Sequence, residues 1–101
     1  MAYCAIMKAE LLIRERVAFP EGDLVEMVVW RVPTPVPPTS HGFKYRFVYI
    51  VEGRRALGYD NERGKGDHRH VDNTEEPFLF TSVDDLLERF VSEVESYRRS
   101  R

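Results

Sequence analysis

The N-terminal third of the chain alternates between apolar and polar positions in a way that predicts a hairpin. Residues 7–17 place apolar side chains at Met7, Ala9, Leu11, Ile13 and Val17. A repeat of two residues is typical of a strand with one buried face. Residues 24–32 are apolar on both sides and rich in β-branched residues, which favours a more central strand. The turn-forming residues 19–23 join the two strands.

A second hairpin is predicted in the middle of the chain. Residues 43–51 alternate again, followed by a tight turn at 52–54 and a fourth strand over 55–60. After a glycine-containing loop at 61–66, residues 68–71 predict a short fifth strand. The apolar side of the third strand is a row of aromatic residues: Phe43, Tyr45, Phe47 and Tyr49. We expect this row, and Trp30, in the core beneath a helix; the alternative is a platform that stacks on nucleobases.

The chain closes with an amphipathic helix whose start is marked by Ser82 as N-cap and Asp85 three positions later. Apolar residues then recur at i, i+3, i+4 and i+7: Val83, Leu86, Leu87, Phe90, Val91, Val94 and Tyr97. The predicted fold is therefore α+β, an antiparallel sheet of four to five strands with one C-terminal amphipathic helix packed on one face. The other face is left for solvent, for binding or for a homodimer.

Composition fits one small domain. The 101 residues carry 43% hydrophobic and 32% charged residues, so we predict a single domain over 1–101. Within it, residues 33–42 form a proline-rich connecting loop and residues 1–6 form a dispensable extension. No apolar run reaches the ~20 residues of a membrane span, and no signal-peptide pattern is present. The single cysteine, Cys4, cannot form an internal disulfide. We expect a cytoplasmic protein.

Charge is distributed unevenly despite a net charge of −2. Residues 41–71 hold seven Lys/Arg against four acids, together with all three histidines. Arginine-rich segments suit phosphate and carboxylate groups, so this segment could bind an anion. Residues 72–97 hold eight acids against Arg89 alone. The acidic segment is an ordinary amphipathic helix, a mimic of nucleic acid or a surface that docks a basic partner segment.

The candidate chemistry lies in residues 58–70, which are almost entirely polar or titratable, with three glycines. If this stretch ends in a strand, His68 and His70 share one face about 7 Å apart. Two imidazoles suit acid/base work near neutral pH, so the first hypothesis is RNA cleavage without a metal or other cofactor. The catalytic candidates are His68, His70, Lys65, Asp67, Arg46 and Tyr59. The substrate-binding candidates are Arg63, Lys44, Tyr45, His41 and Arg69.

In this hypothesis the two histidines exchange protons with the ribose and the leaving group, and Asp67 orients an imidazole. Lys65 and Arg46 stabilise the phosphate. Two other hypotheses stay open. Asp67, His68 and His70 could bind zinc or another divalent metal, as a metal-binding hydrolase would. The chain could also be a module that binds nucleic acid or a partner without catalysis, with purely structural histidines.

The sequence resembles a specific family over most of its length. The segments that carry the resemblance are residues 29–33, 40–46, 59–61, the run Lys65-Gly66-Asp67-His68-Arg69-His70, and the stretch from Glu76-Pro77-Phe78 into the helix. They are similar to the TumE family of prokaryotic toxin components. The resemblance implies a toxin with a cognate antitoxin, which in such pairs is often a winged-helix DNA-binding protein. A ribonuclease activity with an RNA substrate follows only by analogy with other small toxins.

Overall fold

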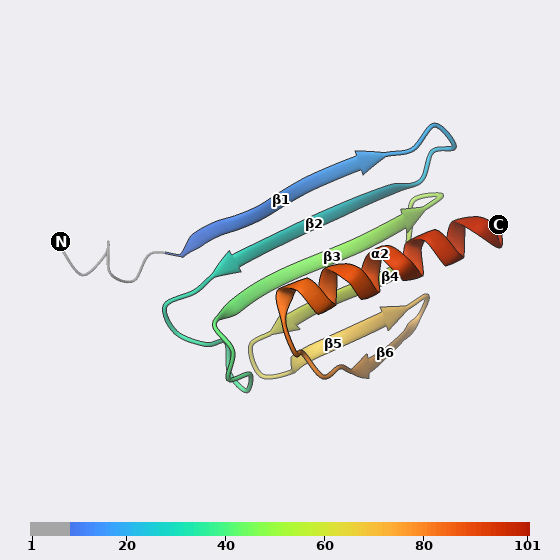
Figure 1. The fold of residues 1–101 in the computed structure, drawn as a ribbon. Helices are drawn as coiled ribbons and strands as arrows, with labels where there is room; N and C mark the ends of the chain where they lie inside the picture. Colours follow the sequence, from blue (N-terminus) through green and yellow to red (C-terminus); the bar gives the residue numbers. More distant parts are fainter. Residues whose placement is uncertain (1–8) are drawn as a thin grey trace.

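A computed structural model describes residues 9–101 of the chain as one sheet and one helix (Figure 1). The elements are β1 (Glu10–Ala18), β2 (Leu24–Arg31), β3 (Phe43–Val51), β4 (Arg54–Glu62), β5 (Gly66–Val71), β6 (Thr74–Pro77) and α2 (Val83–Arg99). The strands are arranged in the order β1-β2-β3-β4-β5-β6, and every neighbouring pair is antiparallel. The predicted α+β class and the single C-terminal helix are confirmed. The expected extension at residues 1–6 lies outside the described residues.

The prediction of four to five strands was wrong, because the sheet of the described residues has six. The missed strand is β6, four residues that are all exposed. It is an edge strand that pairs only with β5, and neither of its faces is buried. Because no side chain of β6 has to be apolar, its sequence shows no apolar alternation. Hydrogen bonding to β5, rather than burial, holds this strand in the sheet.

Short turns fix the register of strands β3, β4 and β5. Glu52 and Gly53 between β3 and β4 both have positive φ, at 52° and 77°. That is the backbone of a type I′ turn, whose twist matches that of the flanking strands. Between β4 and β5, Gly64 (φ 88°) turns the chain so that Asp60 pairs with His68. The turns therefore decide which polar residues of β4 and β5 lie side by side.

The aromatic row of β3 forms the centre of the core, as predicted. Tyr45, Phe47 and Tyr49 are buried and face α2, which buries Leu86, Phe90 and Val94 against the sheet. Figure 1 shows α2 running along the middle strands, with β1 at the far edge of the sheet. Trp30 was expected in this core, and that expectation was wrong. It pairs with Lys44 on the opposite side of the sheet and is 36% exposed.

The start of α2 matches the prediction. The Ser82 hydroxyl accepts a hydrogen bond from the backbone N–H of Asp85 at 3.0 Å, which satisfies one free donor of the first turn. The carboxylate of Asp85 accepts instead from the Thr81 hydroxyl (2.7 Å), so the pair is not a reciprocal capping box. One member of the predicted apolar stripe, Val91, is 44% exposed.

The proline-rich connection between β2 and β3 packs against the β4–β5 turn. The backbone N–H of Gly64 donates to the carbonyl of Pro37 at 2.8 Å. A Cβ added at Gly66 would come within 3.3 Å of the Pro38 ring, and Gly66 also has a positive φ of 83°. The loop thus supports the turn that aligns β4 with β5.

Candidate active site on the open face of the sheet

The sheet face opposite α2, called the open face here, carries a row of charged residues on adjacent strands. Arg46 of β3 pairs with Asp60 of β4, and Asp60 pairs with His68 of β5. Directly paired residues of antiparallel strands have Cβ atoms about 5 Å apart and point to the same face. A cation, a carboxylate and an imidazole therefore stand next to one another on a surface that the helix does not cover.

His70, the next residue of β5 on the open face, binds the carboxylate of Asp60. The guanidinium of Arg55 donates to His70 Nδ1 at 3.1 Å. Since that nitrogen accepts, Nε2 carries the proton and donates to Asp60 Oδ1, also at 3.1 Å. His70 is buried, and both of its ring nitrogens are occupied. Its geometry is that of a group that orients Asp60.

The ring nitrogens of His68 have different surroundings from those of His70. Its Nδ1–H donates to the carbonyl of Gly66 at 3.1 Å. Its Nε2 lies 3.8 Å from a carboxylate oxygen of Glu75, beyond hydrogen-bond distance. Within residues 9–101, Nε2 of His68 has no hydrogen-bond partner. This nitrogen is free to exchange a proton with a ligand.

Lys65 and Glu75 border the histidines. The Lys65 ammonium lies 3.4 Å from Glu75, whose other oxygen is 3.7 Å from His70 Nδ1. Burial raises the pKa of Glu75, but the hydrogen bond from Lys65 and the charges of Lys65, His68 and His70 outweigh it, so the net shift is downward. Glu75 therefore keeps a negative charge beside His68.

Beside the charged row, β2 and β3 form a shallow hollow of about 250 Å³. Its lining residues are Val28, Trp30, Lys44, Tyr45, Arg46 and Asp60. Trp30 presents an exposed aromatic ring, and the exposed Arg46 lies at the boundary between the hollow and the charged row. The Lys44 ammonium also donates to the backbone carbonyl of Asn61. An aromatic ring beside two cations suits a nucleotide, because the ring can stack on a base while the cations bind phosphate.

Asp67 lies on the other side of the sheet. It pairs with Asn61, on the face covered by α2, and its Oδ1 accepts hydrogen bonds from His41 Nε2 (2.8 Å) and the Tyr45 hydroxyl (2.6 Å). Burial and the bond to Asp67 raise the pKa of Tyr45, so this hydroxyl stays protonated. Asp67 therefore orients His41 rather than His68 or His70. His41 also stacks on Phe80 at 3.9 Å.

Tyr59 and Arg69 belong to the helix side as well. The Tyr59 hydroxyl donates to Glu93 of α2 at 2.6 Å and accepts from Arg69 Nε at 3.1 Å. Arg69 also binds Glu93 at 2.8 Å. Burial, followed by the bond to Glu93, raises the pKa of Tyr59 to about 12. These three residues tie α2 to the sheet. Arg63 lies exposed in the β4–β5 turn.

The residues suggested for a metal do not converge. His68 and His70 are on the open face, and Asp67 is on the helix side. In the part of the chain that the structure describes, no group of three or more His, Cys, Asp or Glu side chains is arranged to hold a metal ion.

Trp30, Glu75 and Asp60 lie at the site but are not among the site residues predicted from the sequence. The sequence does hold a signal for Asp60. The signal that could have found it is the symmetry of the β4–β5 hairpin about Gly64. Asp60 and His68 lie four residues before and after that glycine, so a hairpin centred there pairs them.

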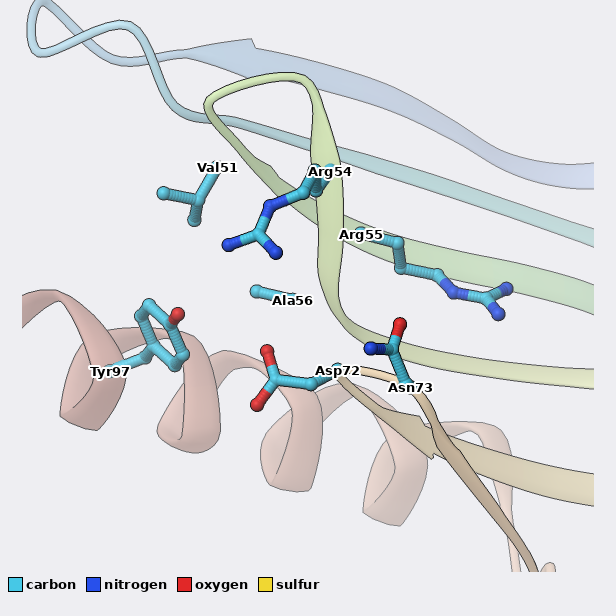
Figure 2. Close-up of a pocket in the computed structure, with 7 residues that line it drawn as sticks. All are labelled: Val51, Arg54, Arg55, Ala56, Asp72, Asn73 and Tyr97. Carbon is cyan, nitrogen blue, oxygen red and sulfur yellow. The ribbon is translucent and has the colours of Figure 1, made fainter.

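A further pocket of about 230 Å³ lies at the other end of the sheet, where the β3–β4 and β5–β6 turns meet α2. Figure 2 shows Arg54 and Asp72 on opposite sides of it, with Tyr97 of α2 beside them. Except for Arg55, which extends from this pocket to His70, none of its lining residues contributes to the cluster on the open face.

Comparison with known proteins identifies the family to which the chain belongs. The sequence model of the family described as "Toxin TumE" matches residues 5–98. The chain belongs to the TumE toxin family. As a TumE-family protein it is the toxin component of a pair, and membership implies a cognate antitoxin. No curated protein and no solved structure gave a match. Within residues 9–101 of this TumE-family chain, no helix is long and apolar enough to cross a membrane.

Proposed function

We propose that this TumE-family toxin is a ribonuclease whose active site is the open face of the sheet. The observation that carries the proposal is the cross-strand row Arg46–Asp60–His68, with a cation, a carboxylate and an imidazole on three neighbouring strands. RNA cleavage by its own 2′-hydroxyl needs these three kinds of group: a base, an acid and a cation that stabilises the phosphate.

The proposed reaction is a transesterification. Asp60 takes the proton of the ribose 2′-hydroxyl, and the 2′-oxygen attacks phosphorus. The bond from phosphorus to the 5′-oxygen breaks, and His68 donates its Nε2 proton to that oxygen. The products are a 2′,3′-cyclic phosphate and a free 5′-hydroxyl, and none of these steps requires a metal ion.

The neighbouring side chains support these two groups. Arg46 stands beside Asp60, where it can neutralise the charge that develops on the phosphate oxygens. Lys44 adds a second cation at the hollow, and Trp30 offers a ring on which a base can stack. His70 acts through Asp60, as a positioning residue. Lys65 keeps Glu75 beside the two histidines.

The RNA is proposed to be single-stranded where it is cut, because a base can stack on Trp30 only when it is unpaired. The partner that silences the toxin is the cognate antitoxin. We propose a winged-helix DNA-binding protein, by analogy with other members of the family.

The test is cleavage of total RNA by the purified protein in the presence of EDTA. The wild-type protein should produce fragments. His68→Ala should lower the cleavage rate at least about 100-fold, the usual size of a lost general acid. His41→Ala is the matched control, because it removes an imidazole from the other side of the sheet. Circular dichroism should show that both variants are folded.

Each alternative gives a distinct result. Loss of activity in His41→Ala with full activity in His68→Ala would move the active site to the Asp67 cluster. Cleavage that disappears with EDTA and returns with zinc would favour the metal-dependent hydrolase. Salt-sensitive RNA binding with no cleavage by any folded protein would favour a binding module without catalysis.

A further inference from the structure

An apolar groove runs between α2 and the first two strands, on the helix side of the sheet. Its volume is about 240 Å³. The walls come from β1 and β2 (Val17, Val25, Met27) and from α2 (Phe90, Val91, Val94). None of these residues belongs to the open face or to the proposed active site. Among residues 9–101, α2 covers the middle of the six-stranded sheet and nothing covers β1, and this leaves the groove (Figure 1).

The groove exposes apolar side chains on both of its walls. Val17 of β1 is 43% exposed and Val91 of α2 is 44% exposed. Ile13, on the same side of β1, is half-buried and packs against the edge of the core. Water-exposed valines facing each other across a groove favour the burial of a third apolar surface.

The rim of the groove is acidic. Asp84, Glu88, Val91 and Glu95 follow one another at spacings of four, three and four residues, so they form one stripe along α2. Glu15 of β1 faces the same side of the sheet, since it pairs with Met27. All four carboxylates are exposed.

These acids are not neutralised by the described part of the chain. Among residues 9–101, no salt bridge involves Glu15, Asp84, Glu88 or Glu95. Arg98, which lines the groove, is already bound to Glu21 and Asp23 at 2.7 and 2.9 Å. The groove therefore combines an apolar floor with unpaired negative charge.

We propose that this groove is the docking site of the cognate antitoxin, through an amphipathic helix with apolar anchors and Lys/Arg on its flanks. A helix laid in a groove buries anchors at i, i+3, i+4 and i+7, and its basic flanks would pair with the acidic rim. A second copy of the toxin fits less well, because a two-fold interface would bring two acidic rims together. Docking here leaves the open face free, so the proposal does not depend on the ribonuclease activity.

The test uses the protein encoded by the gene adjacent to this one, purified and titrated calorimetrically into the toxin. Val91→Lys places a cation in the apolar wall of the groove and should weaken binding by about thirtyfold or more, the size of a central interface residue. The double variant Glu88→Lys/Glu95→Lys should bind the antitoxin more weakly than wild type at low salt. The ratio of the two dissociation constants should fall as the salt concentration rises. Leu79→Lys, at an 83% exposed site away from the groove, and Glu52→Lys in the β3–β4 turn are the matched controls.

In cells, the Val91→Lys toxin should still inhibit growth, and co-expressed antitoxin should no longer relieve the inhibition. If Val91→Lys fails to fold, Val17→Lys places a cation in the opposite wall of the same groove, on β1. The proposal is overturned if the adjacent gene product does not bind wild-type toxin, or if it binds the groove variants within threefold of wild type. It is also overturned if the free toxin sediments as a dimer that Val91→Lys dissociates, because the occupant is then a second copy.

Discussion

His68 and His70 are two residues apart on the same face of β5, yet the partners of their ring nitrogens differ. Both nitrogens of His70 are bound, to Arg55 and Asp60, while Nε2 of His68 is free among the described residues. This difference is the reason that the proposed mechanism gives proton transfer to His68 and positioning to His70. A period of two predicts that both side chains share a face, but it says nothing of which nitrogen is free.

His70→Ala should lower kcat for RNA cleavage about tenfold and leave KM nearly unchanged, because it frees the Asp60 carboxylate to rotate. His70→Gln keeps an N–H donor near the same place and should restore most of the rate. Steady-state kinetics on a short single-stranded RNA measures both. A positioning role is contradicted if both variants lower KM and kcat to the same extent. It is also contradicted if neither variant lowers kcat.

Asp23 provides a pH-dependent prediction about stability. It is buried in the β1–β2 turn and binds the Tyr49 hydroxyl, Arg98 and Arg101. The hydrogen bond from Tyr49 and the contact with Arg98 lower its pKa from 3.8 to about 2, despite burial. A carboxylate with a lowered pKa in the folded state binds fewer protons than in the unfolded chain. Its stabilisation is therefore present above pH 3.8 and is lost as the pH falls towards 2.

We expect Asp23→Asn to be less stable than wild type at pH 7 in urea denaturation. The difference should persist down to about pH 4 and narrow between pH 3.8 and 2. Glu52→Gln, in the exposed turn between β3 and β4, is a control that should match wild type throughout. A stability difference that is independent of pH would rule out the carboxylate as its source.

At the scale of elements, the strength of the hydrophobic pattern decided what the sequence could predict. β3 has an aromatic residue at every second position from Phe43 to Tyr49, α2 has an apolar stripe with a period of 3.6, and both occur where the pattern predicts them. β6 is polar and exposed, so it carries no such signal. Trp30 sits in a strand that is apolar on both sides, and in such a strand the pattern does not tell which face the helix covers.

At this scale, the contribution of the Ser82 N-cap to the stability of the protein can be predicted. Ser82→Ala removes the acceptor for the Asp85 N–H and should cost about 1 kcal/mol of unfolding free energy. Ser82→Asp keeps an acceptor and adds a negative charge at the helix N-terminus, so its stability should equal or exceed that of wild type. Urea denaturation measures both. Equal destabilisation by Ala and Asp would show that the cap is not what starts the helix.

At the scale of the molecule, the described part of the chain places one helix on a six-stranded sheet, which leaves two surfaces for binding. The open face carries Arg14, Arg16, Lys44, Arg46 and Arg55 against four carboxylates (Glu26, Asp60, Glu62 and Glu75), whereas the rim of the groove is acidic. The sequence predicts a basic middle and an acidic end, but not their separation onto opposite sides of the sheet. That separation depends on strand register and on where the proline loop places His41, and no local pattern encodes either.

The charge of the open face predicts salt-sensitive RNA binding. Arg14 lies in the same cross-strand row as Arg46, two strands away, and makes no ion pair among the described residues. Arg14→Ala, tested in the His68→Ala background to prevent cleavage, should weaken binding and reduce the slope of log K against log salt by about 0.7, the value for one phosphate on a single strand. Filter binding at several salt concentrations measures this. Arg99→Ala on α2 should leave the slope unchanged, and a drop equal to that of Arg14→Ala would place the RNA on the wrong face.

The chemistry of the cut ends tests the central claim most directly. A defined single-stranded RNA is incubated with the purified toxin in EDTA, and the fragments are identified by mass spectrometry. Transfer by the 2′-hydroxyl, with Asp60 as base and His68 as acid, predicts 2′,3′-cyclic phosphate and 5′-hydroxyl ends that Asp60→Asn and His68→Ala do not produce. Fragments with 3′-hydroxyl and 5′-phosphate ends, or no fragments from folded wild-type protein, would contradict the account.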